Sequence, residues 1–438
     1  MICHKDFNIV YLSDFQNKTK KTKQNKNIYY MASICFYFQV HQPYRLRNYT
    51  LFDATYSDKY FDEHLNKEIF HKVANKCYLP ANQMFLELLK KHPEFKICFS
   101  LSGVFLEQAL KYHPEVIESF QKLVQTGQVE ILSETYYHSL SSVYSKTEFV
   151  DQIKKHKKII KKLFHKIPKI FRNTELIYSD AIGNTISELG YKGMLIEGVD
   201  RILEWRSPNY LYSNHNNSLK LLLKNYQLSD DIAFRFSDTN WKEYPLTIDK
   251  FTHWIDLLEA DQIVNLFMDY ETIGEHQWTD SGIFEFFKQL PNELLNAGHC
   301  FKTPSEIVKQ YEVKDQINSL EYISWADSER DLSAWRSNPI QFEALEKLYS
   351  LEKIVKSMNN RKLLENWKLL TTSDHFYYMC TKFWADGDVH KYFSPYNSPF
   401  DAYIYFMNAL KDLEWRILTS NLIENKKNKR NLKKKLLF

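Results

Sequence analysis

Two acidic side chains stand directly after apolar segments that predict buried strands, a placement that suits acid and base chemistry. Residues 265–278 read NLFMDYETIGEHQW, with Asp269 where the apolar run ends. Residues 169–178 read KIFRNTELIY, with Glu175 at the exit of a second such run. Loops at the carboxyl ends of parallel strands hold the chemistry of α/β folds. The pair therefore predicts acid and base work on a polar substrate.

Alternating strands and helices are predicted to position these carboxylates. Apolar runs predict strands at residues 34–40, 95–102 and 128–133, and further strands that start at residues 169, 193 and 263. Amphipathic segments lie between them, for example at residues 80–91, 146–165 and 180–189. Residues 219–236 hold one strand or two. Near-continuous apolar strands indicate a sheet covered on both faces, so we expect an α/β fold built on a distorted, TIM-like (β/α)7 barrel.

The pattern changes beyond residue 302, where helical segments follow one another without buried strands between them. These segments cover residues 328–357, 361–370 and 399–422, and aromatic residues are dense among them, including Trp325, Trp335, Trp384 and Tyr392. We expect a disordered extension at residues 1–30, a catalytic barrel at 31–302, a helical region at 303–424 that completes the active site, and a basic tail at 425–438.

Composition fits one large domain with an appended region. The 438 residues are 44% hydrophobic, which is enough for a sizeable core. Five lysines lie in residues 18–26 and seven basic residues in 426–435, so the formal charge of +4 comes from two short segments. The remainder is net acidic and implies no basic face. Solvated tails are therefore expected, and nucleic acid is not an expected partner.

Several other classes of protein are not indicated. The six cysteines show no C-x-x-C spacing, and no phosphate loop or dinucleotide fingerprint is visible, so no cofactor is expected. No apolar stretch approaches the length that spans a bilayer, and residues 1–30 lack the features of a secretory signal. We expect a cytoplasmic protein with no membrane partner.

Polar side chains also follow the other early strands. His41 ends the first strand, Glu107 comes after the second, and Glu134 and His138 come after the third. Any one of them alone would be assigned to a cap or an ion pair. Together with Glu175 they predict a polar site at one end of the barrel.

Five motifs in this order resemble the conserved regions of glycoside hydrolase family 57, in its α-amylase and α-amylase-like branch. They are HQPYRLR from His41, SGVFLEQ from Ser102, FRNTELIY from Phe171, MDYETIGEHQW from Met268 and WADSERDLSAW from Trp325. The resemblance spans Ser33 to about Leu422. The segment that starts at Thr372, TSDHFYYMCTKFWADGDVHKYFSPY, is also similar to the helical region of that branch.

The resemblance implies a retaining mechanism in which Glu175 is the nucleophile and Asp269 the general acid and base. For such an enzyme the two carboxyl groups should lie about 5 Å apart, with a raised pKa for Asp269 and a low one for Glu175. Arg172, three residues before Glu175, could favour the ionised nucleophile. The resemblance also implies a group of substrate-binding residues: His41, Glu107, His138, Glu271, His276, Trp278, Trp325, Asp331 and Trp335. Gln39 stands where many relatives carry a histidine, so sugar contacts could differ there.

The expected activity is cleavage of α-glucosidic linkages, expected to be α-1,4, in glycogen, starch or maltodextrins. A 4-α-glucanotransferase or branching enzyme with the same catalytic pair is one alternative, and a non-catalytic glucan-binding protein is a second. Related barrel deacetylases hold a metal with an aspartate and two histidines. Here His41, His138 and His276 lie on separate segments without an H-x-x-x-H motif, so no metal is expected. Oligomeric state and chain-length preference stay open.

Overall fold

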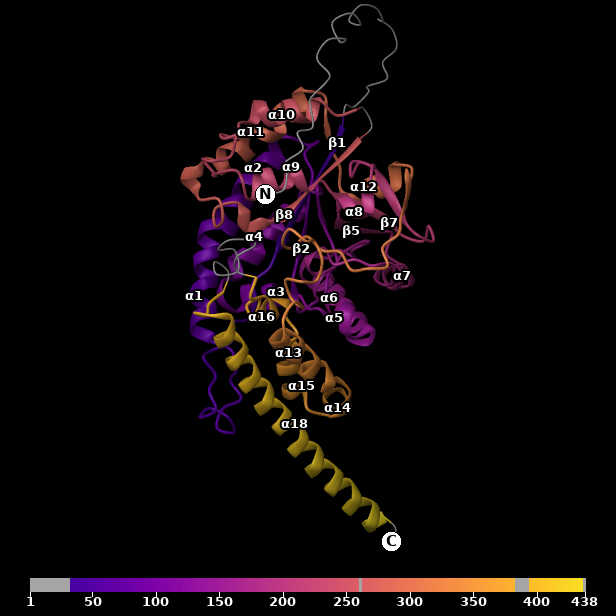
Figure 1. Ribbon diagram of the computed structural model, residues 1–438. Helices are drawn as coiled ribbons and strands as arrows, with labels where there is room; N and C mark the ends of the chain where they lie inside the picture. The colour runs from indigo at the N-terminus through magenta and orange to yellow at the C-terminus, as the bar shows by residue number, and fades with distance from the viewer. Residues whose placement is uncertain (1–31, 260–261, 383–393, 436–438) are drawn as a thin grey trace, which may run out of the picture.

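A computed structural model describes residues 32–259, 262–382 and 394–435, with side chains described as far as residue 421 (Figure 1). The predicted extension at residues 1–30 and the aromatic residues Trp384 and Tyr392 lie outside this part of the chain. Within it, no helix combines the length and the apolar character needed to cross a membrane.

In the described part of the chain, ten strands form two sheets of five. The first has the order β3-β2-β1-β8, with β9 also paired to β1, and the second has the order β10-β6-β7-β5-β4. All pairs are parallel except β6 with β7. The strands are β1 (Ala32–Val40), β2 (Ile97–Leu101), β3 (Val129–Ile131), β4 (Ile170–Arg172), β5 (Gly193–Glu197), β6 (Leu211–Asn214), β7 (Lys220–Lys224), β8 (Gln262–Asp269), β9 (Cys300–Phe301) and β10 (Asp315–Ile317).

The predicted strands are all present, and the ambiguous segment is resolved. Residues 219–236 contain one strand, β7, followed by helix α9 (Tyr226–Ala233). Helix α9 begins where the side chain of Asn225 accepts a hydrogen bond from the backbone N–H of Leu228. This cap satisfies one of the free N–H groups of the first helical turn, so the chain leaves the strand and enters a helix at that residue.

The two sheets are joined at two places. Ser133, just past β3, forms a parallel bridge with Phe171 of β4, and its N–H donates to the carbonyl of Ile170 (3.0 Å). At the other junction the N–H of Asn225 donates to the carbonyl of Asn265 in β8 (2.9 Å). Seven strands therefore follow the cyclic order β1-β2-β3-β4-β5-β7-β8. This α/β arrangement agrees with the predicted fold class and is consistent with a distorted (β/α)7 barrel.

Alternate residues of the strands face two different apolar cores. On β1, Phe36 and Phe38 pack into the core beneath the outer helices. Cys35 and Tyr37 belong to an inner cluster that also takes side chains from β4, β5, β7 and β8, among them Phe267. Because successive side chains of a strand point to opposite faces, both faces of β1 are buried. This explains the near-continuous apolar runs in the sequence.

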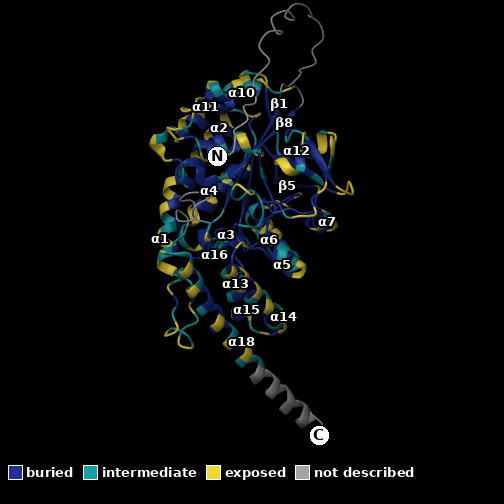
Figure 2. Cartoon of the chain, in the orientation of Figure 1, coloured by how far each residue is buried: buried dark blue, intermediate teal, exposed yellow. Residues whose placement is uncertain are grey.

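Helices surround the strands, which are buried as Figure 2 shows. The helices of this layer are α1 (Glu63–Val73), α2 (Leu79–Lys91), α3 (Gly103–Tyr112), α4 (Pro114–Gln125), α5 (Ser141–Tyr144), α6 (Lys146–Phe164), α7 (Asp180–Glu188), α8 (Asp200–Leu203), α10 (Ile248–Asp256), α11 (Ile283–Asn296) and α12 (Pro304–Gln310).

The C-terminal helical region packs against the outer face of the second sheet. Its helices are α13 (Pro339–Ser350), α14 (Glu352–Ser357), α15 (Arg361–Leu370), α16 (Ser373–Tyr377) and α18 (Pro399–Lys435). Their apolar side chains share one core with Phe171 and Met194 of the sheet. Strand β10 pairs with β6, so sheet structure extends past residue 302, where only helices were expected. Helix α18 continues to Lys435 and so includes most of the predicted basic tail.

Candidate active site

A cavity of about 400 Å³ contains both carboxylates singled out in the sequence, Glu175 and Asp269. The strand ends supply one wall and the helical region supplies the other. Six of the predicted substrate-binding residues also line it: His41, His138, Glu271, His276, Trp325 and Trp335. Its size suits a short sugar segment, because small-molecule sites usually range from about 300 to 1,000 Å³.

Glu175 lies in a tight turn immediately after β4. The turn is a short 3-10 segment, Thr174–Leu176, in which Glu175 itself has a left-handed backbone conformation (φ 56°). A non-glycine residue in such a conformation costs on the order of 1–3 kcal/mol, which the surroundings must offset. The side chain of Asn173 donates to the carbonyl of Ile177 across the turn (2.9 Å). The strained conformation turns the Glu175 side chain into the cavity.

Hydrogen bonds hold both carboxylate oxygens of Glu175. The Nε2–H of His138 donates to Oε1 (3.0 Å), and the indole N–H of Trp325 donates to Oε2 (2.7 Å). Partial burial raises the pKa of Glu175, but His138, the Arg172 guanidinium and the Trp325 hydrogen bond outweigh it, so the pKa lies below its usual value. This environment favours an ionised carboxylate that is available to attack an electrophile.

Asp269 occupies the end of β8, opposite Gln39 of β1 in the parallel register. Burial, followed by the negative charge of Glu175, raises its pKa to about 6. A carboxyl group with this pKa can hold a proton near neutral pH and release it during a reaction. The environments of the two carboxyl groups therefore separate their pKa values in opposite directions.

Glu271 does not continue the strand that carries Asp269. β8 ends at Asp269, and Glu271 lies in the following 3-10 turn, Tyr270–Thr272, which still directs it to the cavity. The hydroxyl of Tyr78 donates to its carboxyl group. Burial and then the charge of Asp269 raise the pKa of Glu271 to about 8. Glu271 therefore lines the cavity and is at the same time held in place by the hydrogen bond from Tyr78.

Two imidazole rings stack beside Glu175. The ring centroids of His41 and His138 lie 4.0 Å apart with an interplanar angle of 20°. His41 Nδ1 contacts the hydroxyl of Ser102 (2.7 Å), and its Nε2 contacts Asp374 Oδ2 (3.0 Å). Asp374 comes from α16, so the helical region reaches the strand-end wall directly. The third predicted histidine, His276, has a pKa lowered to about 4 by burial, so its ring is neutral near pH 7.

Three predicted sugar-binding residues lie outside the cavity lining. Glu107 points from α3 to Tyr136, whose hydroxyl donates to it (2.5 Å). Trp278 is 61% exposed, with the Lys76 ammonium 5.6 Å from its ring centroid. Asp331 accepts a hydrogen bond from the backbone N–H of Ser333 (2.8 Å). These residues belong to motifs that pass close to the site along the chain. Their side chains nevertheless point away from the cavity, because of the helix face or the turn on which they lie.

Other cavity residues were not singled out from the sequence. They include Asp374, Tyr377 and Tyr378 of the helical region, and a charged group at one side of the cavity formed by Lys224, Asp230 and Arg330. The TSDHFYY segment, which resembles the family's helical region, contained the signal for Asp374. Arg330 lies in the motif WADSERDLSAW, but Lys224 and Asp230 belong to no motif, and the ion pair between Asp230 and Arg330 joins segments 100 residues apart.

No metal centre is evident in the part of the chain that the structure describes. There, no three or more histidine, cysteine, aspartate or glutamate side chains lie together in a position to hold an ion. The carboxyl groups that line the cavity can transfer protons or attack an electrophile, and the imidazole of His138 and the indole of Trp325 hold Glu175 in place.

Two carboxyl groups with opposite pKa shifts in one cavity, at the strand ends of an α/β fold, suit the chemistry of carbohydrate-cleaving enzymes. The sequence pattern of glycosyl hydrolase family 57 matches residues 35–319. A protein of Methanocaldococcus jannaschii that carries an alpha-amylase name is 45% identical over 397 residues, covering 88% of this chain and 84% of the relative. The chain belongs to glycoside hydrolase family 57 and is a glycoside hydrolase.

Solved structures of the family share the fold. A branching enzyme from Thermococcus kodakaraensis superposes with a TM-score of 0.67 at 13% identity, covering 88% of this chain and 90% of that one. A 4-alpha-glucanotransferase from Thermococcus litoralis gives a TM-score of 0.55 at 18% identity, covering 80% of this chain. This chain covers only 52% of the glucanotransferase. At these identities the likeness concerns the fold alone.

Proposed function

We propose that the protein hydrolyses α-glucosidic bonds, of the α-1,4 type, in maltodextrins, starch or glycogen, with retention of configuration. One observation carries the proposal: Glu175 and Asp269 line one cavity, and their pKa values are shifted in opposite directions. A retaining glycosidase needs one ionised carboxylate and one protonated carboxyl group at the scissile bond. The alpha-amylase name of the 45% identical relative supports an α-glucan as substrate.

In the first step a Glu175 oxygen bonds to the anomeric carbon while the glycosidic oxygen leaves. Asp269 gives its proton to that oxygen, so the released sugar departs as an alcohol. In the second step Asp269 takes a proton from water, the water oxygen bonds to the anomeric carbon, and Glu175 departs as a carboxylate. Trp325 and Trp335 line the cavity and offer flat surfaces to the apolar faces of glucose rings.

The helical region has a part in this proposal. Trp325, Trp335 and Asp374 come from the segment after residue 302 and line the cavity together with the strand-end residues. We therefore propose that residues 303–424 complete the active site of a barrel at 31–302. A cytoplasmic location and a storage glucan as the natural substrate belong to the same proposal.

Two alternatives share this site. In a 4-α-glucanotransferase or a branching enzyme, a sugar hydroxyl takes the place of water in the second step. In a glucan-binding protein without turnover, the cavity binds the chain and no bond is broken. Neither alternative has a specific observation that favours it over hydrolysis.

Incubation with maltoheptaose separates these functions. Hydrolysis gives shorter maltooligosaccharides and new reducing ends, with the α-anomer formed first in ¹H NMR spectra. Products longer than the substrate indicate transfer, and binding without new reducing ends indicates a binding protein. The Glu175→Gln and Asp269→Asn variants should lose activity while they keep the unfolding temperature of the unmodified protein to within a few degrees. Full activity in either variant would falsify the proposal.

A further inference from the structure

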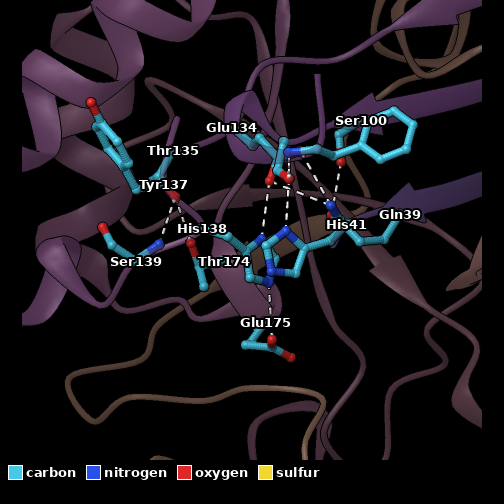
Figure 3. A network of polar contacts seen from close by, with 12 residues as sticks. Gln39, His41, Ser100, Glu134, Thr135, Tyr137, His138, Ser139, Thr174 and Glu175 are labelled. Carbon is cyan, nitrogen blue, oxygen red and sulfur yellow. Dashed lines mark hydrogen bonds and ion pairs between the residues drawn. The ribbon is translucent and has the colours of Figure 1, made fainter. Parts of the chain in front are cut away.

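A chain of buried polar groups continues behind the nucleophile candidate. His138 lies between two carboxylates: its Nε2 contacts Glu175 Oε1 (3.0 Å), and its Nδ1 contacts Glu134 Oε2 (3.1 Å). Figure 3 shows Glu134 and Glu175 on opposite sides of the imidazole pair. His138 is 2% exposed and Glu134 is fully buried. A buried carboxylate is costly unless it is paired, so the contact of Glu134 with His138 requires an explanation.

The orientation of Gln39 defines what Glu134 can do. In the structure the hydroxyl groups of Tyr37 (2.7 Å) and Ser100 (2.8 Å) both donate to Gln39 Oε1. The amide nitrogen consequently faces Glu134 and donates to its Oε1 (3.2 Å). Glu134 thus accepts from the Gln39 amide, at Oε1 and at a longer distance at Oε2 (3.4 Å), and contacts His138 with Oε2. This pattern is fully satisfied when Glu134 is a carboxylate and His138 carries both of its N–H groups.

The neighbouring imidazole of His41 is satisfied in its neutral form. Its Nε2–H can donate to Asp374, and its Nδ1 can accept from the hydroxyl of Ser102. Burial and then the charge of His138 lower the pKa of His41, whereas the two carboxylates bonded to His138 outweigh burial and raise the pKa of that ring to about 9. The stacked pair therefore holds a single positive charge, and it lies on the ring next to Glu175.

Hydroxyl groups tie together the two turns that carry these groups. Both His138 (φ 50°) and Glu175 (φ 56°) have left-handed backbone conformations. The hydroxyls of Thr135 and Thr174, one in each turn, hydrogen-bond to each other (2.6 Å). Two strained residues joined by a short polar link indicate that the geometry between His138 and Glu175 is fixed in advance.

We propose that Glu134 is a positioning residue that keeps His138 a permanent imidazolium, so that His138 serves to hold and charge-stabilise Glu175 rather than to bind sugar. The inference rests on the proposed function of Glu175 as nucleophile and deepens it. In the covalent intermediate Glu175 becomes a neutral ester. The second carboxylate, Glu134, then still holds the proton on His138, and the imidazolium stabilises the Glu175 carboxylate when it departs.

Several charged or titratable groups face His138 and have to be considered together. They are Glu134 from the loop after β3, Glu175 and Arg172 from the β4 end, His41 and Asp374 across the stacked ring, and Asp269 from β8. Glu134→Gln removes one of the two anions that bond to His138 and leaves the others in place. His156 accepts from the Glu134 N–H and donates to a carbonyl through its other nitrogen, so it is neutral and does not compete.

A direct test follows the protonation of His138 by NMR. In ¹⁵N-histidine-labelled protein, the His138 resonances, assigned by their absence in His138→Gln, should show a doubly protonated ring at pH 7.5. In Glu134→Gln the titration should move from about 9 toward the ordinary histidine value of 6.5. A neutral His138 in the unmodified protein at pH 7.5, or a titration that Glu134→Gln leaves unchanged, overturns the inference. This measurement requires no enzymatic activity, so it is independent of the proposed function.

A second test uses the pH dependence of kcat/KM on maltoheptaose. From the lowered pKa of His138 in Glu134→Gln up to about pH 9, kcat/KM of this variant should fall relative to that of the unmodified enzyme by up to about tenfold per pH unit, because His138 then loses its charge in this range. Glu134→Asp, which keeps a carboxylate, should recover part of the loss. Asp269, with a pKa of about 6, and Glu271, with a pKa of about 8, ionise in every variant, so the test compares the ratio of kcat/KM between the variant and the unmodified enzyme at each pH.

The matched control is Glu130→Gln. Glu130 lies on β3, four residues before Glu134, and bonds to Ser305 away from the cavity. Its variant should keep the pH profile of the unmodified enzyme. A pH-independent loss in Glu134→Gln, equal at pH 6.5 and pH 9, would show a purely structural role and would overturn the inference. Absence of turnover in the unmodified protein would refute the proposed function, and the NMR titration would still decide on Glu134.

Discussion

The ends of β4 and β8 each place a carboxyl group in the same cavity, but the two carboxyl groups have different surroundings. At β4, Glu175 receives hydrogen bonds on both oxygens, from His138 and Trp325. At β8, burial and the charge of Glu175 dominate the environment of Asp269. Burial raises the pKa of both groups, so burial alone does not distinguish them. The neighbouring donors and charges decide which carboxyl group is ionised.

Arg172 adds to the difference from beneath the β4 end. Its guanidinium is fully buried, lies 4.7 Å from the ring centroid of Trp325, and has no hydrogen-bond partner for its nitrogens among the residues that the structure describes. It lowers the pKa of both Glu175 and Asp269. The β4 end is therefore the cationic half of the site, and the β8 end is the half where two carboxyl groups, Asp269 and Glu271, come close together.

The largest effects are expected when each carboxyl group is removed in turn and the variants are compared on substrates with different leaving groups. Glu175→Gln should lose activity by roughly 10⁴-fold or more on every substrate, because no nucleophile remains. Asp269→Asn should lose about 10²–10⁴-fold on maltooligosaccharides, since leaving-group protonation is lost. On an aryl α-glucoside whose phenol needs no proton, Asp269→Asn should still show a burst of phenol in stopped-flow measurements. Equal behaviour of the two variants would contradict the assigned roles.

The fold and much of this site follow from the sequence because they depend on short-range patterns. The apolar runs predicted six of the seven strands of the cyclic order, and the motif residues Glu175, Asp269, His41 and Trp325 do line one cavity. A run of apolar residues ending in a carboxylate is sufficient for that inference, since parallel strands place their carboxyl ends together.

What the sequence did not show depends on backbone direction and on distant partners. Residues three apart on a strand face opposite sides, so Arg172 and Glu175 would point apart if β4 continued. Glu175 instead lies in a left-handed turn, and Arg172 lowers its pKa. Glu107 belongs to a motif, yet its helix face points toward Tyr136. Asp374 lies 333 residues from His41 in sequence and meets it only through the packing of α16.

A smaller effect is expected from Trp325→Phe, which weakens the β4 side selectively. Phenylalanine keeps an aromatic ring beside Arg172 but cannot donate a hydrogen bond to Glu175. Loss of one hydrogen bond to a charged group costs about 1.5–3 kcal/mol, which corresponds to a loss in kcat/KM of roughly 10- to 100-fold. The acidic limb of the pH profile should also move to higher pH, because the indole N–H lowers the pKa of Glu175. A change in KM alone would indicate that Trp325 only binds sugar.

A smaller effect is expected on the pKa of Asp269 when the charge of Glu175 is removed. Asp269 has to be protonated in the free enzyme, so kcat/KM should decline as the pH rises through about 6. In Glu175→Gln the neighbouring negative charge is absent, and the pKa of Asp269 should fall. It should nevertheless stay above the ordinary aspartate value of 3.8, because burial is the larger cause of the shift. Carboxyl ¹³C NMR of Asp269 in the two proteins measures this pKa. An unchanged titration would show that the charge of Glu175 does not act on Asp269.

The smallest effect is expected at Glu107, which belongs to neither half of the site. Its carboxyl group accepts from the Tyr136 hydroxyl and lies 3.8 Å from the Lys155 ammonium, and it does not line the cavity. Glu107→Gln keeps the shape and an acceptor oxygen for Tyr136, so kcat/KM should change by less than about threefold. A tenfold loss would mean that the contact acts at a distance, because Tyr136 is two residues from His138 and could shift the strained turn that holds the imidazolium. In that case the cationic half of the site would extend into α3, and the contrast between the ends of β4 and β8 would not be confined to the cavity wall.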